Sequence, residues 1–349
     1  MDILATARER LALARNLGPS GIRETVRSEG VERIGRGTYL KTDPTWESWE
    51  RARVVNLART IAALECGTDA RACLTSAAVL WDLPIWQFPT TVDILIGRKG
   101  WRKSVDLPTT SGLKNPGTEQ LRRHGYAVEE SDHAHVSDVP TLSLMRLALD
   151  ISLQWHPRDA LVTVDSILRR LAEPNRADRG GSDARAATVR AELSERLEAM
   201  GPQRGTRKAR AVIAAASPWS ESPGESVTRW AALALGLPEP VCQHEFTRSD
   251  GRHFYLDLFW ELFKLGIEFD GLVKYRGEHG ADVVVAEKVR DDEIRRSGIS
   301  LVHLDSATAR STSALKSTLR GALPEAAWRL AQPRSGLWTP DLAGWRTGR

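Results

Sequence analysis

The chain has 349 residues, too many for one ordinary domain and enough for two or three. Hydrophobic residues make up 41% and charged residues 27%, a balance typical of globular proteins, which excludes a disordered chain. The formal net charge of +4 permits an anionic partner without requiring one, and three widely spaced cysteines exclude a disulfide framework or a cysteine metal site.

The first residues, MDILATARERLALARN, form an amphipathic pattern that carries Asp2 and Glu9, unlike a signal peptide. No apolar run approaches the roughly 20 residues that are needed to span a bilayer. The cysteine usage is that of a reducing compartment. We therefore expect a soluble, cytoplasmic protein with no membrane contact.

Residues 1–45 are predicted to form two helices followed by a small hairpin. Leucine and alanine recur at helical spacing from Leu4 to Leu17, and a second short helix follows and stops at Gly30. The stretch VERIGRGTYLKT then alternates apolar and polar residues about a glycine pair, which predicts a hairpin. This order is the pattern of a winged helix-turn-helix.

In a winged helix the second helix enters the major groove of DNA and the hairpin contacts the backbone. Arg23 and Arg27 would lie on that helix, and Arg33 and Arg36 on the hairpin. These four arginines are the candidate DNA-binding residues. The alternative is a small packing module with solvated arginines, because helix-turn-helix patterns are easily matched.

Residues 46–172 are predicted to form a central α/β domain. Helices are expected over ESWERARVVNLARTIAALE, CLTSAAVLWDLPIW, VPTLSLMRLALDISLQW and RDALVTVDSILRRLA, with a strand over TTVDILIGR. Residues 173–216 are predicted to be a linker and helix, in which the polar, glycine-rich stretch EPNRADRGGSDARA is an exposed loop.

Residues 217–330 are predicted to form a third domain with the element order α-β-β-β-α-β, before a tail over 331–349. The helix SPGESVTRWAALALGL precedes strand-like runs in PVCQHEFTR, HFYLDLFW and KLGIEFDG. A helix over VVVAEKVRDDEIRRSG and a strand over ISLVHL complete the order. The whole chain is thus expected to be a multidomain α/β protein.

Acidic residues stand at the strand positions of this third domain. Asp257 and Glu268 lie on successive strands, where they could converge on one divalent cation, and Glu225 could approach from the helix. Mg²⁺ takes oxygen ligands, usually one or two carboxylates with waters and substrate phosphates. Asp270 shares a face with Glu268, because strand side chains alternate. A buried carboxylate needs a partner, which a cation or Lys274 would provide.

These motifs resemble the PD-(D/E)XK restriction-endonuclease-like superfamily, in its very-short-patch-repair-like branch. The resemblance covers about 90 residues, through SPGES, FYLDLFW, GIEFDGLVKY and EKVRDDEIRRSGISLVHL. It implies a nuclease fold with Mg²⁺ or Mn²⁺ as cofactor. Asp257 and Glu268 would be metal ligands, Glu225 a ligand borne by the helix, and Gln243 an accessory polar group.

The sequence departs from the superfamily at the lysine expected two residues after the second acid. Asp270 stands there, so the basic role would move to Lys274, and the implied catalytic set is Asp257, Glu268, Asp270 and Lys274. The alternative is structural, with the acids forming salt bridges to Lys274, Lys288 and Arg290 on a neighbouring helix.

Residues 18–170 resemble the AbiEi family of type IV antitoxins. The resemblance rests on GIRETVRSEGVERIGRGTYL, LTSAAVLWDLP and VPTLSLMRLALDISL. Members of that family bind DNA and regulate their own operons through an N-terminal winged helix, which implies DNA and a cognate toxin as partners.

Together the motifs predict a DNA-binding, Mg²⁺-dependent endonuclease-like protein of phage defence or DNA repair. The first alternative is a non-catalytic, antitoxin-like transcriptional repressor that retains the nuclease fold only for binding. The second alternative is an interaction scaffold with no affinity for nucleic acid. Metal-dependent cleavage and salt-dependent DNA binding distinguish the three.

Overall fold

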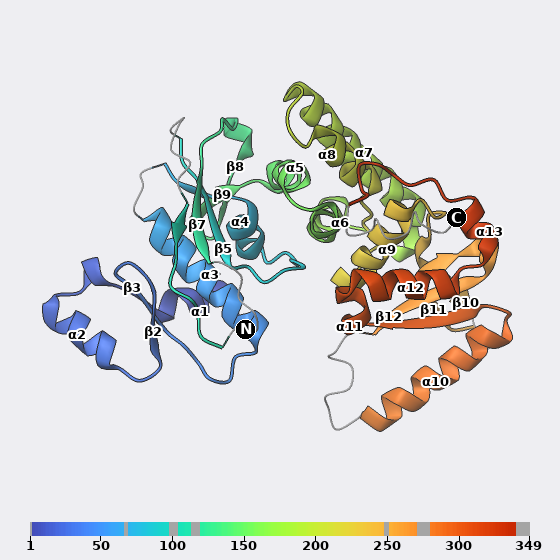
Figure 1. The fold of residues 1–349 in the computed structure, drawn as a ribbon, viewed down its shortest axis with the longest axis horizontal. Coiled ribbons are helices and arrows are strands. Elements are labelled where there is room, and N and C mark those ends of the chain that lie inside the picture. The colour runs from blue at the N-terminus through green and yellow to red at the C-terminus, as the bar shows by residue number, and fades with distance from the viewer. Residues whose placement is uncertain are drawn as a thin grey trace. The chain divides into compact units, whose positions relative to one another are not determined.

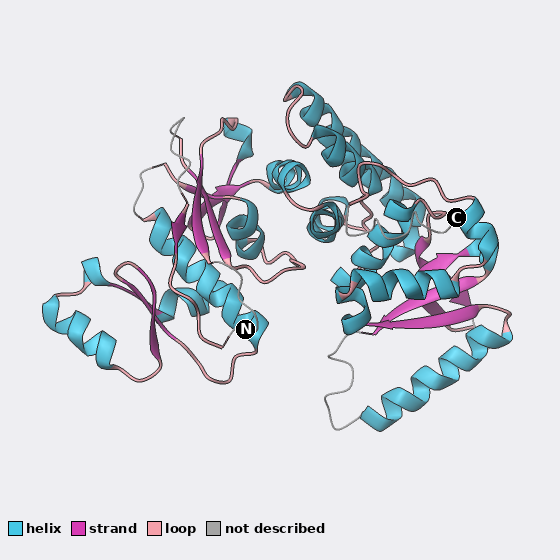
Figure 2. Ribbon diagram, in the orientation of Figure 1, coloured by secondary structure: helices cyan, strands magenta, loops and turns pink. Residues whose placement is uncertain are grey.

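The computed structural model describes residues 2–65, 69–97, 104–112, 119–247, 251–270 and 280–339, with the backbone alone over 280–287. Within these ranges the protein is a mixed α/β protein with three sheets and 13 helices (Figure 1; Figure 2). The chain divides into two compact units, residues 1–150 and 151–349. In the described part, no helix has the length and apolar character to cross a membrane.

The first unit begins with a helix, a short strand, a second helix and a hairpin. The three strands form an antiparallel sheet in the order β1-β3-β2, and Leu13, Ile34 and Leu40 are buried. The elements are α1 (Ile3–Arg10), β1 (Leu11–Leu13), η1 (Ala14–Asn16), α2 (Pro19–Arg27), β2 (Val31–Gly35) and β3 (Thr38–Lys41).

The helical spacing predicted as far as Leu17 is wrong after Arg10. Residues Leu11–Leu13 instead pair with β3, as the third strand of the sheet. An isolated two-stranded hairpin is marginal in water, and a third strand that buries leucines stabilises it more than another helical turn would. The order helix, strand, helix, hairpin is compatible with the predicted winged helix.

The rest of the first unit is a six-stranded mixed sheet in the order β6-β7-β5-β4-β9-β8, packed against helices α3 and α4. α3 begins at a capping box between Glu47 and Glu50. The elements of this part of the first unit are α3 (Ser48–Leu64), β4 (Arg71–Ala72), α4 (Leu74–Leu80), β5 (Thr91–Leu95), β6 (Val105–Asp106), β7 (Gln120–His124), η2 (Glu130–Asp132), β8 (His133–Val136) and β9 (Val139–Leu142).

Two predictions in this region need correction. The predicted helix that starts at Val139 is a strand, β9, followed by α5 (Leu144–Gln154). Pro140 has no backbone N–H and disfavours helical backbone before it, so the chain stays extended until Ser143. The helix expected to reach Pro84 ends at Leu80, and Asp82 has a left-handed φ of 53°.

The second unit starts with three helices that pack on one another. They are α6 (Pro157–Ala172), α7 (Arg179–Ala199) and α8 (Thr206–Ala215). α6 was predicted to belong to the central domain, but it packs on α9 (Pro223–Leu235) through the buried ion pair of Asp165 with Arg229, 2.6 Å apart. This pair joins α6 to α9, which in turn packs on β11 and β12.

The stretch 173–186, predicted as an exposed loop, lies mostly in helix. A short 3₁₀ turn, η3 (Arg176–Asp178), leads into α7, and the Asp178 side chain accepts a hydrogen bond from the N–H of Gly181 as an N-cap. An N-cap satisfies one of the unpaired donors at a helix start, so the glycine pair is tolerated in the first turn.

The predicted order α-β-β-β-α-β is confirmed in the second unit. After α9 come β10 (Val241–Thr247), β11 (His253–Trp260), η4 (Glu261–Phe263), β12 (Leu265–Asp270), α10 (Gly280–Arg296) and β13 (Ser300–Asp305). The sheet order is β10-β11-β12-β13, in which only the last pair is parallel. α10 lies on one side of this sheet and α9 on the other (Figure 1).

Three short helices and an ordered segment close the unit: α11 (Ser306–Arg310), α12 (Thr312–Ala322), α13 (Glu325–Arg329) and residues 331–339. Gly236 ends α9 in the left-handed region, and a Cβ there would meet the backbone of Gln332 at 1.9 Å. Trp230 Nε1 donates to the carbonyl of Leu337. Residues 331–339 of the predicted tail thus pack on α9.

Candidate functional site

Two of the predicted acidic residues of the second unit, Asp257 and Glu225, meet at one glutamine. Gln243 Nε2 donates to Asp257 Oδ1 at 3.0 Å and to Glu225 Oε2 at 3.3 Å. The two carboxylate oxygens therefore lie within two hydrogen-bond lengths of each other. Gln243 is buried on β10, Asp257 lies on β11 and Glu225 on the first turn of α9. Three elements thus contribute to one polar cluster.

Asp257 and Glu268 lie next to each other across β11 and β12. The backbone register of these strands runs from Trp260–Leu265 to Leu258–Ile267. Beyond it, Glu268 Oε1 accepts from the N–H of Asp257 at 3.3 Å, and Asp257 Oδ2 accepts from the N–H of Phe269 at 2.8 Å. At this end of the strand pair, side-chain carboxylates accept the backbone N–H hydrogen bonds that backbone carbonyls would accept if the strand pairing continued.

The pKa of Glu225 in this cluster is raised. Burial, and then the charge of Asp257, raise its pKa from 4.5 to about 8. Its Oε2 accepts hydrogen bonds from the N–H of Glu221 at 2.9 Å and from Gln243. At neutral pH, and without a cation, Glu225 therefore carries its proton.

Two basic side chains from the neighbouring elements contact the remaining acids. Arg290 Nη2 on α10 lies 3.2 Å from Glu268 Oε2. His303 on β13 lies between two carboxylates, with Nδ1 3.1 Å from Asp270 Oδ2 and Nε2 2.7 Å from Asp291 Oδ2. The predicted salt bridge of an acid with Arg290 is confirmed. Asp270 contacts a histidine that was not predicted as a site residue.

The cluster has the donor chemistry of a hard divalent cation. Asp257 and Glu268 are adjacent carboxylates, and two are enough for Mg²⁺ when water and substrate phosphate complete its shell. The described residues contain no set of three His, Cys, Asp or Glu side chains grouped as a metal site. To bind Glu268, a cation would have to displace Arg290 from that carboxylate. Glu225 would supply a further ligand only after losing its proton. Lys274 lies outside the described residues.

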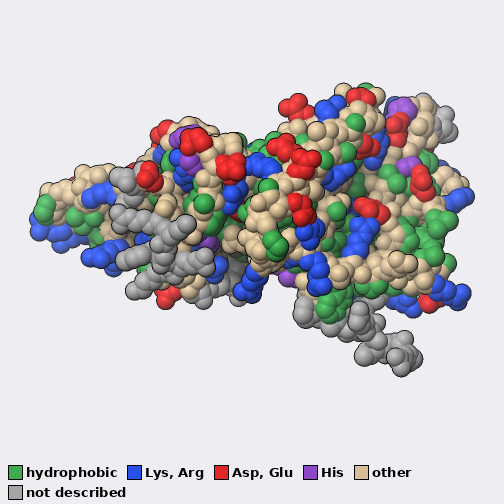
Figure 3. Space-filling view, turned by 90° about the horizontal axis from the view of Figure 1, so that it is seen from above, with side chains coloured by type: hydrophobic (Ala, Val, Ile, Leu, Met, Phe, Trp, Pro, Cys, Tyr) green, Lys and Arg blue, Asp and Glu red, His purple; other side chains and the backbone are tan. Residues whose placement is uncertain are grey.

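The four predicted DNA-binding arginines are all exposed. Arg23 and Arg27 are one helical turn apart on α2 and line the same open hollow. Arg33 lies on β2, and Arg36 lies in the turn that joins β2 to β3. In Figure 3, basic side chains gather at the left, at the end of the first unit that carries α2 in Figure 1.

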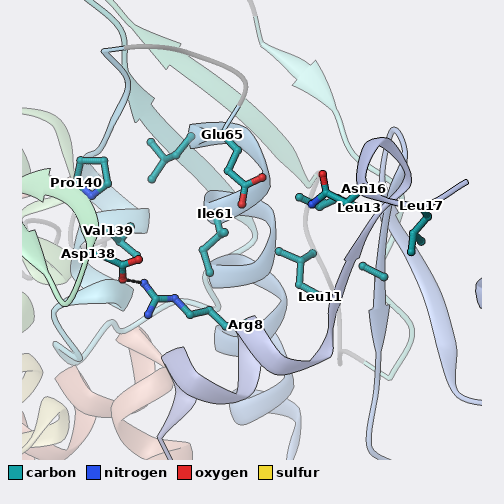
Figure 4. Close-up of a pocket in the computed structure, with 12 residues that line it drawn as sticks. Arg8, Leu11, Leu13, Asn16, Leu17, Ile61, Glu65, Asp138, Val139 and Pro140 are labelled. Atoms are coloured by element: carbon teal, nitrogen blue, oxygen red, sulfur yellow. Dashed lines mark hydrogen bonds and ion pairs between the residues drawn. The ribbon is translucent and has the colours of Figure 1, made fainter.

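The first unit also has a cavity of about 540 Å³ where α1 and β1 meet α3 and β9 (Figure 4). Leu11, Leu13 and Ile61 line it, together with Arg8 and Asp138, which form an ion pair. Its size is that of small-ligand sites. No predicted site residue lies in it.

Three side chains at the acid cluster were not predicted: Arg176, Tyr255 and His303. Arg176 lies in the stretch that is predicted as an exposed loop, and nothing along the chain links it to β10. Tyr255 precedes Asp257 by two residues, and the alternation of strand side chains could have placed it on the same face. His303 lies within the predicted strand ISLVHL and could have been found as a polar residue of that strand.

Comparisons of the chain with protein-family models, with curated proteins and with solved structures found no match. The two family resemblances described above therefore stay predictions, and the geometry of the cluster is the basis for a functional proposal.

Proposed function

We propose that the protein binds DNA through its N-terminal unit and that the acid cluster of the second unit is a Mg²⁺- or Mn²⁺-dependent endonuclease site, in phage defence or DNA repair. The observation that carries the proposal is that Gln243 joins Asp257 to Glu225, while Glu268 accepts a hydrogen bond from the backbone N–H of Asp257 on the adjacent strand. Three acids from three elements gather in a largely buried place, although burial disfavours charged carboxylates. The proposal also takes the second unit to have a restriction-endonuclease-like fold and the first a winged helix.

In this proposal Asp257 and Glu268 hold the cation, and Glu225 adds a ligand when it is deprotonated. A bound divalent cation lowers the pKa of a water ligand and neutralises charge on the scissile phosphate. The protein's own contribution is to fix the carboxylates: the N–H of Phe269 and the amide of Gln243 hold both oxygens of Asp257. Lys274 is proposed to complete the site as its basic residue.

The rival function is a DNA-binding repressor without cleavage, with a toxin as an additional partner. A specific observation favours it: Glu268 and Asp270 already contact Arg290 and His303. Acids that are paired with basic side chains of the protein can simply hold a domain together. The two functions share DNA binding and differ in whether phosphodiester bonds are cut.

The test is incubation with plasmid, single-stranded and hairpin DNA, with Mn²⁺ or with EDTA. We expect nicking that needs the metal and is lost in Asp257→Asn. Asp305→Asn is the control, because Asp305 is an exposed residue of the same sheet that caps α11, a role asparagine also fills. Absence of cleavage at every Mg²⁺ and Mn²⁺ concentration would leave the repressor function.

A further inference from the structure

Two arginines from the helical segment before the sheet reach the acid cluster. Arg179, the first residue of α7, donates from Nη1 to the carbonyl of Gln243 at 3.0 Å and from Nη2 to the carbonyl of Cys242 at 2.7 Å. The backbone of Gln243 has a φ of 49°, in the left-handed region that non-glycine residues rarely adopt. Arg179 thus stabilises β10 at the position where it turns the Gln243 amide toward the acids.

Arg176 contacts the same glutamine by its side chain. Its Nη2 donates to Gln243 Oε1 at 2.8 Å and to Glu221 Oε1 at 2.9 Å. Its guanidinium lies over the ring of Tyr255, 4.3 Å from the centroid. The Arg176 side chain remains 40% exposed.

The rest of this guanidinium is available to a ligand. Within the described residues, the hydrogen bonds of Arg176 all involve Nη2, so Nε and Nη1 keep their donors. Glu221 offsets only part of the positive charge, because Arg169 also contacts the same Glu221 oxygen, at 3.0 Å. With Nη2 donating to two protein oxygens, the N–H groups of Nε and Nη1 can each donate a single charge-assisted hydrogen bond to a phosphate oxygen, from a guanidinium held on an aromatic ring.

We propose that Arg176 binds a backbone phosphate of the nucleic acid at the acid cluster, with Tyr255 as its platform. Tyr255 and Asp257 are two residues apart on β11 and so face the same side of the sheet. Arg176 would hold the phosphate that neighbours the one at the carboxylates. This inference rests on the proposed function, since it names the nucleic-acid contact of that same site.

The experiment measures DNA binding by the full chain in EDTA, so that metal and cleavage play no part. The background variant has Arg23, Arg27, Arg33 and Arg36 replaced by alanine, which removes the proposed contacts of the first unit. Binding of a fluorescent duplex is followed by anisotropy over a range of salt concentrations. Arg176→Met in this background should lower the log–log salt slope by about 0.9, the value of one lost phosphate contact.

Arg320→Met is the matched control. Arg320 is an exposed arginine of α12 that also pairs with a glutamate, Glu325, and also lies over an aromatic ring, that of Trp328 at 4.9 Å. Arg320→Met in the same background should leave the salt slope unchanged. An unchanged slope in Arg176→Met, an equal loss in Arg320→Met, or a background variant that binds no DNA at any salt concentration would each overturn the inference.

A second measurement uses the unaltered chain and does not depend on the folding of a variant. A duplex that carries 5-iodouracil is irradiated with the protein, and the cross-linked peptides are identified by mass spectrometry. Cross-links should include Tyr255, and their complete absence from residues 253–260 would overturn the proposal. If the chain cleaves DNA without these contacts, only this inference is wrong. If it makes these contacts but never cleaves DNA, only the proposed nuclease function is wrong.

Discussion

The raised pKa of Glu225 makes the stability of the second unit depend on pH in a defined direction. In the folded chain this pKa is about 8, against an ordinary value of 4.5. Between these two values the unfolded chain loses a proton that the folded chain keeps, so the free energy of unfolding falls as pH rises from 4.5 to 8. Each pKa unit is worth about 1.4 kcal/mol, which gives at most about 5 kcal/mol over this range.

Glu225→Gln should remove this dependence, because an amide resembles the protonated acid and does not ionise. In EDTA the variant should match the wild type near pH 5 and be more stable near pH 8. The assay is urea unfolding followed by pulsed alkylation of Cys242, which is buried on β10 and so reports on this unit alone.

Glu239→Gln is the control for this prediction, because Glu239 is exposed and pairs with Arg334 at the surface. Its pH profile should follow that of the wild type. A stability difference between Glu225→Gln and wild type that stays constant from pH 5 to 8 would refute the reasoning, and with it the view that Glu225 is protonated beside Asp257.

Three further predictions concern other parts of the chain. Replacing Arg23 and Arg27 by alanine should flatten the salt slope of DNA binding by about 1.8, the value for two phosphate contacts, and an unchanged slope would place DNA elsewhere. Arg290→Met should tighten Mn²⁺ binding measured by calorimetry, since it removes the arginine that competes with the cation for Glu268; weaker binding would show that the arginine supports the site. Asp165→Ala should lower stability in the Cys242 assay by about 3–5 kcal/mol, because Arg229 is left buried without its partner, and a loss below about 1 kcal/mol would contradict this.

The element order of the second unit could be predicted because its signals are local. Strand-like runs such as FYLDLFW, turn residues between them, and Gly236 after α9 each act within a few residues. The same locality explains why Asp257 and Glu268 could be placed on adjacent strands. The alternation of side chains along a strand shows which residues share a face. The short connection through η4 makes β11 and β12 neighbours in the sheet.

The parts that could not be predicted depend on contacts between distant residues. β1 is a strand because it pairs with β3, about 27 positions later, and its own leucine spacing is equally suited to a helix. Arg176 reaches Gln243 across 67 positions. Nothing in the stretch EPNRADRGGSDARA shows that its arginines have partners, since the polar, glycine-rich composition is that of a loop.

The pairing of Glu268 with Arg290 was foreseen as an alternative to metal binding, and the structure contains it. The sequence could not decide between these partners, because a strand acid can reach either a helix arginine or a cation. The cost of a buried carboxylate requires a partner without specifying which one.

The most direct test of the metal site is a titration of the full chain with Mn²⁺, in which the electron paramagnetic resonance signal of the free ion is measured. The wild type and Asp305→Asn should remove Mn²⁺ from solution at one site that is lost in both Asp257→Asn and Glu268→Gln. Equal binding by all four proteins, or no binding by the wild type, would contradict the proposal that these two carboxylates hold a catalytic cation.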